Sequence, residues 1–250
     1  MKIDVYFTPA HVDESQIRDR VVVVIDVLRA ATSIATALFN GAREIIPVQD
    51  VETALKIHSN LGEDVALLCG ERNGKIIEGF DLGNSPLEYS REKVEGKVLI
   101  FSTTNGTVAI TKAKQSKELV VGSFVNLSAV AKYISDRPET DVAIICAGKL
   151  NMFSLEDAVC AGMIIDQLEV QMSLPVALAD GSRAAQVLYK RFERSISKLL
   201  QTTDHGKYLS EIGFEKDLEV CATVDSVPVL PVLVDNRVLK IYQSREDTER

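Results

Sequence analysis

Short apolar runs alternate with amphipathic stretches along most of the chain. The run VVVVID at residues 21–26 consists mainly of β-branched residues, which is typical of a strand covered on both faces of a sheet. A helical pattern from Leu28 to Leu38 follows this run, and Asn40-Gly41 is expected to end the helix because both residues tolerate a left-handed backbone. This segment predicts one strand-then-helix unit.

The same unit recurs along the first two thirds of the chain. The predicted strands are the segments EIIPVQ, DVALLCG, KVLIFS, ELVVGSF and DVAIICAG, and the predicted helices begin after Asp50 or span Thr107–Ala113, Ser128–Ile134 and Ser154–Leu168. Alternating strands and helices predict a largely parallel sheet with helices on both faces. The expected fold class is α/β, with three layers in the order α/β/α.

The last third of the chain has a different pattern. Residues 182–200 predict one long amphipathic helix, since apolar residues recur near helical spacing among many Arg and Lys. The segment VPVLPVLVDNRVLKIY predicts a C-terminal β-hairpin with its turn at Asp235-Asn236. Pro228 and Pro231 favour an edge position for this hairpin, and its addition would make the sheet mixed.

Size and charge limit the class of protein. With 250 residues, 46% of them hydrophobic, the chain can form a sizeable core, and we expect one α/β domain over residues 1–250 or two closely packed lobes. The formal net charge of −8 argues against non-specific binding to nucleic acid or to an anionic membrane, because either would need a basic face. A small anionic substrate must then be bound by a few local cationic groups.

Targeting and redox features predict a cytoplasmic protein. The first residues, MKIDVYFTPAHVDES, lack the apolar segment of a signal peptide, and no apolar run is long enough to span a membrane. The four cysteines, Cys69, Cys146, Cys160 and Cys221, are far apart and form no CxxC pair. We therefore expect free thiols, with neither a zinc site nor a disulfide framework.

Polar residues directly follow several predicted strands, where ligands of open α/β sheets bind. Asp26 ends an apolar run, and burying its carboxylate without a partner would be costly, so we expect a cation beside it. The guanidinium of Arg29 suits a phosphate, carboxylate or sulfonate group. The structural alternative is a buried salt bridge between the two residues or, for Asp26, a cap of the following helix.

The loop at the end of KVLIFS combines hydroxyl groups and a glycine between a strand and a helix. Its residues are a candidate phosphate cradle, because backbone amides and side-chain donors can converge on an anion there: Ser102, Thr103, Thr104, Asn105, Gly106 and Thr107. The loop matches neither the Walker A pattern nor GxGxxG. The alternative is a helix cap with a tight turn.

A long polar loop from Gly70 to Pro86 is expected to be functional, because loops of this length are uncommon inside compact domains. Glu71 is a candidate metal ligand or general base at its start. Asn84 and Ser85, near its end, are candidate hydrogen-bond partners for the substrate.

Other titratable residues have two interpretations each. His205 is a candidate general acid, or a solvated histidine at the start of a helix. Cys146, at a strand end, is a candidate nucleophile or a small core residue. Asp217 is a candidate metal ligand, although its spacing to later polar residues does not decide between helix and strand. Glu156 and Asp157 open a predicted helix and are explained by its dipole.

Several segments together resemble the 2-phosphosulfolactate phosphatase family. They are VVVVIDVLRAATSIATAL, GERNGKIIEGFDLGNSPLEY, TTNGT, CAG, EDAVCAG, HGKYLSEIGFEKDLEVCATVD and VPVL, which occur in this order over nearly the whole chain. The resemblance implies Mg²⁺-dependent hydrolysis of 2-phospho-3-sulfolactate to 3-sulfolactate and phosphate, a step of coenzyme M biosynthesis in methanogens. It also implies an α/β/α fold unlike the common phosphatase folds. Action on other 2-hydroxy-acid phosphates stays open.

These expectations combine into one hypothesis for the site. Asp26, assisted by Glu71 or Asp217, would hold Mg²⁺, while Arg29 and the 102–107 loop would bind the remaining anionic oxygens. We expect an attacking water activated by a carboxylate, with covalent attack by Asp26 or Cys146 as the second choice. The rival functions are a non-catalytic anion-binding protein and an isomerase or lyase acting on a 2-hydroxy acid. The enzyme class suggests a homodimer.

Overall fold

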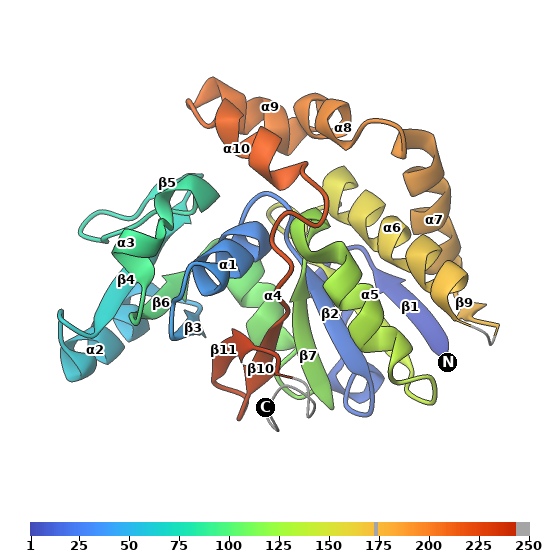
Figure 1. Ribbon diagram of the computed structural model, residues 1–250, viewed down its shortest axis with the longest axis horizontal. Coiled ribbons are helices and arrows are strands. Elements are labelled where there is room, and N and C mark those ends of the chain that lie inside the picture. Colours follow the sequence, from blue (N-terminus) through green and yellow to red (C-terminus); the bar gives the residue numbers. More distant parts are fainter. Residues whose placement is uncertain (173–174, 244–250) are drawn as a thin grey trace.

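An eleven-stranded sheet crosses the structure, a computed structural model that describes residues 1–172 and 175–243 (Figure 1). The strands are β1 (Lys2–Tyr6), β2 (Val21–Ile25), β3 (Glu44–Val48), β4 (Ala66–Arg72), β5 (Lys75–Ile76), β6 (Val98–Ser102), β7 (Glu118–Gly122), β8 (Val142–Cys146), β9 (Ala177–Leu178), β10 (Pro231–Val234) and β11 (Val238–Ile241). Their order across the sheet is β5-β4-β6-β3-β11-β10-β7-β2-β8-β1-β9.

Two groups of parallel strands make up most of this sheet. In one group β6 pairs in parallel with β3 and β4, and in the other β2 pairs in parallel with β7 and β8, with β1 beyond β8. The antiparallel hairpin of β10 and β11 lies between the groups, pairing with β7 on one side and β3 on the other. The predicted mixed sheet and C-terminal hairpin are confirmed.

The predicted edge position of the hairpin is wrong, because the hairpin occupies the middle of the sheet. Proline at the first residue of a strand does not interrupt a ladder of hydrogen bonds, and Pro231 holds that position in β10. Pro228 precedes the strand altogether. The hairpin pairs with each neighbouring strand through one pair of residues. Val232 of β10 pairs with Val120 of β7, and Leu239 of β11 pairs with Ile45 of β3.

Ten helices lie around the sheet in the described part of the chain. They are α1 (Ala30–Phe39), α2 (Val51–Leu61), α3 (Arg91–Val94), α4 (Gly106–Lys112), α5 (Leu127–Ser135), α6 (Leu155–Gln171), α7 (Asp180–Phe192), α8 (Ile196–Thr202), α9 (Asp204–Glu211) and α10 (Glu215–Cys221). None of them is long and apolar enough to cross a membrane.

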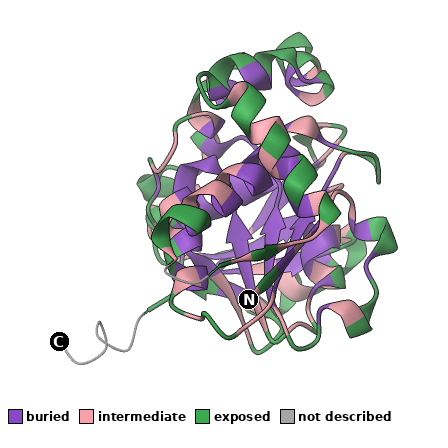
Figure 2. Ribbon diagram, turned by 90° about the vertical axis from the view of Figure 1, so that its right-hand side faces the viewer, coloured by how far each residue is buried: buried purple, intermediate pink, exposed green. Residues whose placement is uncertain are grey.

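Strand β2 shows how the two faces of the sheet are covered. Alternate side chains of a strand point to opposite faces, and Val21, Val23 and Ile25 pack in a cluster with residues of α5 and α6. Val22 and Val24 pack in another cluster with residues of α1 and α4. The strands are buried while the outer faces of the helices are exposed (Figure 2). The run of five branched residues is therefore explained by burial on both faces.

The long helix predicted over residues 182–200 is instead two helices, α7 and α8. The hydroxyl of Ser195 accepts a hydrogen bond from the amide of Lys198 at 3.3 Å and caps the second helix. The periodic apolar residues did not reveal this cap. The short helices α8, α9 and α10 form a group above the sheet in Figure 1, and we call residues 196–221 the helical cap.

Candidate active site

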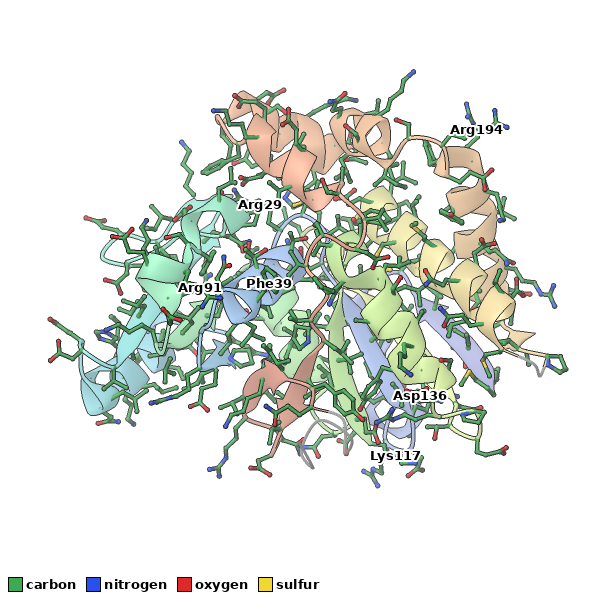
Figure 3. The ribbon with its side chains drawn as sticks, in the orientation of Figure 1. Arg29, Phe39, Arg91, Lys117, Asp136 and Arg194 are labelled. Carbon is green, nitrogen blue, oxygen red and sulfur yellow. The ribbon has the colours of Figure 1, made fainter. Side chains whose placement is uncertain are left out.

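A cavity of about 260 Å³ lies between the ends of the strands and the helical cap. Its lining comes from both parts of the molecule: Asp26, Leu28, Arg29, Glu71, Asn73, Gly74, Asn84, Thr104, Asn105, Lys149, Leu150, His205 and Tyr208. Figure 3 shows Arg29 at this end of the sheet, whereas Lys117 and Asp136 lie at the opposite end. Seven of these residues had been predicted from the sequence as site residues: Asp26, Arg29, Glu71, Asn84, Thr104, Asn105 and His205.

Asp26 follows β2 directly and is buried, with 6% of its surface exposed. One carboxylate oxygen accepts a hydrogen bond from the amide of Ala30 at 3.3 Å. Burial, opposed by the positive field of His205, raises the pKa of Asp26 to about 6. The other oxygen lies against Gly106, where a Cβ atom would come within 2.6 Å of it. Gly106 thus lets the 102–107 loop approach this carboxylate.

Glu71, near the end of β4, connects two loops across the cavity. Its Oε2 accepts the amide of Gly74 and its Oε1 accepts the amide of Thr104, each at 2.7 Å. The loop after β6 is therefore held to the β4–β5 turn. A carboxylate oxygen that accepts one hydrogen bond still has a lone pair for a cation.

The 102–107 loop divides into two parts. The amide of Thr103 donates to the hydroxyl of Thr107 at 3.0 Å, and the amide of Thr107 donates to the hydroxyl of Thr103 at 3.1 Å, in the manner of a helix cap. Ser102 accepts a hydrogen bond from Arg72. Only Thr104 and Asn105 of this loop line the cavity. The helix-cap alternative thus describes Thr103 and Thr107, while Thr104 and Asn105 remain available to a ligand.

Arg29 pairs with Asp217 of α10, and the alternative that it pairs with Asp26 is wrong. Its Nη1 donates to Asp217 Oδ2 at 2.7 Å, and both side chains are 2% exposed. Asp217 Oδ1 accepts from the hydroxyl of Ser85 at 2.6 Å. Since the guanidinium of Arg29 already neutralises Asp217, and neither Asp217 nor Ser85 lines the cavity, we do not assign Asp217 to the metal or Ser85 to the substrate.

Arg29 also contacts the turn between β4 and β5 and a second residue of the helical cap. Its Nη2 donates to the carbonyl of Gly74 at 2.6 Å, and the guanidinium carbon lies 4.3 Å from the ring centroid of Phe214. The same side chain lines the cavity. Arg29 can therefore contribute positive charge to the site while it holds the cap in place.

His205, in the first turn of α9, lines the cavity and lies next to a buried acid. Its Nδ1 is 3.4 Å from Oε1 of Glu156, whose side chain is 2% exposed. The sequence explained Glu156 by the dipole of α6 alone, and that explanation missed its neighbour from the helical cap. No pattern within either helix predicts this approach.

Asp157 connects the loops that follow β2 and β8. Its two oxygens accept the amides of Val27 at 2.9 Å and Gly148 at 3.1 Å. Burial, followed by the negative field of Asp26, raises the pKa of Asp157 well above its ordinary value. This carboxyl group is part of the framework behind Asp26, and the helix dipole alone does not account for it.

Cys146, the last residue of β8, is fully buried and does not line the cavity. Burial, followed by the field of Asp157, raises the pKa of its thiol well above the ordinary value. All four cysteines are free and buried. The predicted free thiols are confirmed, and the surroundings of Cys146 favour a small core residue over a nucleophile.

Six residues that line the cavity were not predicted as site residues, and three of these have polar side chains: Asn73, Lys149 and Tyr208. The ammonium of Lys149 lies 4.9 Å from the ring centroid of Tyr208, and the Tyr208 hydroxyl donates to the carbonyl of Asn73 at 2.9 Å. Residues from a turn, a loop and the helical cap thus meet across the cavity. The only signal in the sequence was the position of Lys149 just after a predicted strand.

A divalent cation fits this site if the protein supplies few of its ligands. The described residues contain no group of three or more His, Cys, Asp and Glu side chains placed to hold a metal. Mg²⁺ is commonly held by one or two carboxylates together with waters and substrate phosphate. Asp26 and Glu71 line the same cavity, and the buried Oδ1 of Asn84 accepts no hydrogen bond from the described residues. This donor set suits Mg²⁺.

Known proteins match the chain over most of its length. A family model described as 2-phosphosulpholactate phosphatase matches residues 6–236. A protein named "Probable 2-phosphosulfolactate phosphatase" from Caldanaerobacter subterraneus subsp. tengcongensis is 44% identical over 234 residues, 93% of this chain and 95% of its own. Proteins of the same name from Thermotoga petrophila and Clostridium acetobutylicum are 42% and 40% identical, over 93% and 96% of this chain and 96% and 100% of theirs.

Proposed function

The chain belongs to the 2-phosphosulfolactate phosphatase family, and from this premise we propose that it hydrolyses 2-phospho-3-sulfolactate, or a related 2-hydroxy-acid phosphate, with Mg²⁺. The family resemblance seen in the sequence is confirmed, and the chain is a phosphoric monoester hydrolase. The products of the proposed reaction are 3-sulfolactate and inorganic phosphate.

The observation that carries the proposal is one cavity lined by both carboxylates and cationic side chains. Asp26 and Glu71 supply negative oxygens for a divalent cation, and Arg29, Lys149 and His205 supply donors for an anion. A substrate with phosphate, carboxylate and sulfonate groups needs both kinds of partner, because its charges must be neutralised as it leaves water.

Asp26 and Glu71 would hold the Mg²⁺ of the proposed enzyme. When bound, the ion supplies Lewis-acid polarisation of the phosphoryl group and neutralises its charge. The raised pKa of Asp26 supports this assignment, since a buried carboxylate that ionises with difficulty gains most from an added cation. Thr104, Asn105 and Arg29 would bind the remaining anionic oxygens.

The chain's own residues account for the proton transfers of the proposed reaction. The oxygen of an attacking water bonds to phosphorus, and the bond from phosphorus to the ester oxygen breaks. Asp26 accepts the proton that the water loses. His205 donates a proton to the departing ester oxygen, so that neutral alcohol leaves. Cys146 takes no part because its thiol stays protonated and lies outside the cavity.

Phosphate release from a panel of 2-phospho-hydroxy acids, with and without a sulfonate, tests this function. We expect release with Mg²⁺, no release after chelation, and recovery when Mg²⁺ is added back. Binding of the esters without any release would favour the anion-binding alternative, and conversion with phosphate retained would favour the isomerase or lyase. Full release from a chelator-treated sample would rule out the Mg²⁺-dependent mechanism.

A further inference from the structure

Glu156 is buried in a way that the dipole of α6 does not require. An acid in the first turn of a helix stabilises the dipole while exposed to water, as the exposed Glu52 does in α2. The side chain of Glu156 is 2% exposed, and its Oε1 accepts no hydrogen bond from the described residues. Burying a carboxylate oxygen without a partner is costly, so a partner is expected at this atom.

The neighbour of that oxygen is the imidazole of His205. Nδ1 of His205 lies 3.4 Å from Oε1 of Glu156, and the two residues come from α9 and α6. The hydroxyl of Thr203 accepts the amide of Gly206 at 3.0 Å, which fixes the start of α9 and the place of His205 within it. Hydrogen bonds of this kind are often long in the free enzyme and shorten when substrate binds.

We propose that Glu156 is a positioning residue that accepts the Nδ1–H of His205 and so presents Nε2 to the ester oxygen of the substrate. The role of Nε2 rests on the function proposed above. Which nitrogen of a histidine carries the proton is set by the hydrogen bond that the other nitrogen makes. With Nδ1–H held by Glu156, the exchangeable proton of the reaction is the one at Nε2, which His205 donates to the departing oxygen.

The ¹⁵N chemical shifts of His205 test the pair without any turnover. At about pH 9, where an imidazole is ordinarily neutral, we expect the wild-type ring to carry its proton on Nδ1. In Glu156→Leu, which removes the acceptor and keeps a side chain of similar size, the proton should move toward Nε2. The same tautomer in both proteins would overturn the proposal.

A double-mutant cycle tests whether Glu156 acts through His205. We expect Glu156→Leu to lower kcat on the order of 10-fold with little change in KM. This loss is smaller than the roughly 10²- to 10⁴-fold that acid–base catalysis supplies, because His205 itself is retained. In a His205→Asn background the same change should have no further effect on kcat. Glu156→Gln keeps an acceptor oxygen and should recover part of the loss.

Glu52→Leu is the matched control, because it removes an exposed acid from the first turn of a helix whose residues do not line the cavity. Its kinetics should equal those of the wild type. Two results would contradict the positioning role: additive losses in the cycle, or a loss of Mg²⁺ affinity in Glu156→Gln, which would make Glu156 a ligand. If Glu156→Leu does not fold, Glu156→Gln takes its place in the cycle.

The two experiments separate this inference from the proposed function. If the tautomer of His205 depends on Glu156 but the protein releases no phosphate, the pairing of Glu156 with His205 is supported and the phosphatase activity is refuted. If phosphatase activity is normal but Glu156→Leu changes neither the tautomer of His205 nor kcat, only the pairing of Glu156 with His205 is refuted.

Discussion

Asp26 and Asp217 are two buried carboxylates with opposite surroundings. Asp217 accepts hydrogen bonds from Arg29 at 2.7 Å and from Ser85 at 2.6 Å, one on each oxygen. Asp26 accepts only the amide of Ala30 at 3.3 Å among the hydrogen bonds to its side chain in the described residues. Their exposed fractions are 6% for Asp26 and 1% for Asp217, so depth does not distinguish them.

The difference separates a structural carboxylate from a reactive one. The guanidinium of Arg29 neutralises Asp217 and fastens α10 to the loop after β2, so this pair joins the helical cap to the sheet. Asp26 forms no ion pair with the described residues, and burial, opposed by the field of His205, raises its pKa to about 6. A buried acid left in this condition is a candidate for binding a cation or moving a proton.

Asp26→Asn is expected to give the largest effect on turnover. The amide has the same shape but cannot accept a proton and is a weaker ligand for Mg²⁺, so kcat/KM should fall roughly 10⁴-fold, about 5.5 kcal/mol. Steady-state kinetics with thermal unfolding of the same samples provide the check. If Asp26→Asn remains active, Asp26 is not the reactive carboxylate of the site.

Asp217→Asn should act mainly on stability. Removing one partner of a buried ion pair leaves the other charge unpaired, so the free energy of unfolding should fall by about 3–5 kcal/mol. Denaturant unfolding measures this change. The exposed pair of Arg91 and Glu95, with side chains 65% and 61% exposed, provides the control, since Glu95→Gln should change stability by less than about 0.5 kcal/mol. Equal losses in the two variants would contradict the structural role of Asp217.

The stability of the metal-free protein should depend on pH through Asp26. Its pKa rises from the ordinary 3.8 to about 6 on folding, so between these values the folded state binds more protons than the unfolded state. The free energy of unfolding is therefore lost as pH rises from about 4 to about 6, by about 3 kcal/mol at most. Asp26→Asn should lack this loss. Its stability relative to the wild type should therefore be greater at about pH 8 than at about pH 4. A stability difference that does not change with pH would refute the raised pKa.

The sequence predicted the repeated strands well, because five-residue apolar runs such as the one in β2 require burial on both faces. It missed β1, because the alternating polar and apolar residues Lys2–Tyr6 form only a short run beside the long apolar runs of the other strands. The sequence also did not predict the position of the hairpin in the sheet. Strand order depends on which sheet edges remain unpaired after the rest of the chain has folded, and the two prolines indicated only a local restriction.

The sequence predicted the site residues at the strand ends, and His205 of the helical cap, but it missed the contacts that the cap makes with the rest of the molecule. Asp26, Glu71 and Thr104 lie on or just after β2, β4 and β6, so their approach follows from the general rule for open α/β sheets. The contacts of Arg29 with Asp217 and of Glu156 with His205 join residues far apart in the sequence. Helical spacing describes each helix alone, and it says nothing about which helix will lie opposite it.

Cys146 offers the smallest expected effect and the clearest test of the non-covalent mechanism. It is the last residue of a central strand, outside the cavity, and burial keeps its thiol protonated. Cys146→Ala removes only a sulfur atom from the core, so stability should fall by roughly 1–2 kcal/mol while kcat changes less than about 3-fold. A covalent phosphocysteine, which mass spectrometry after acid quenching would detect, should be absent from the wild-type protein. If Cys146→Ala folds and binds Mg²⁺ normally but has no activity, then Cys146 is the nucleophile, and Asp26 would no longer be the reactive member of the comparison.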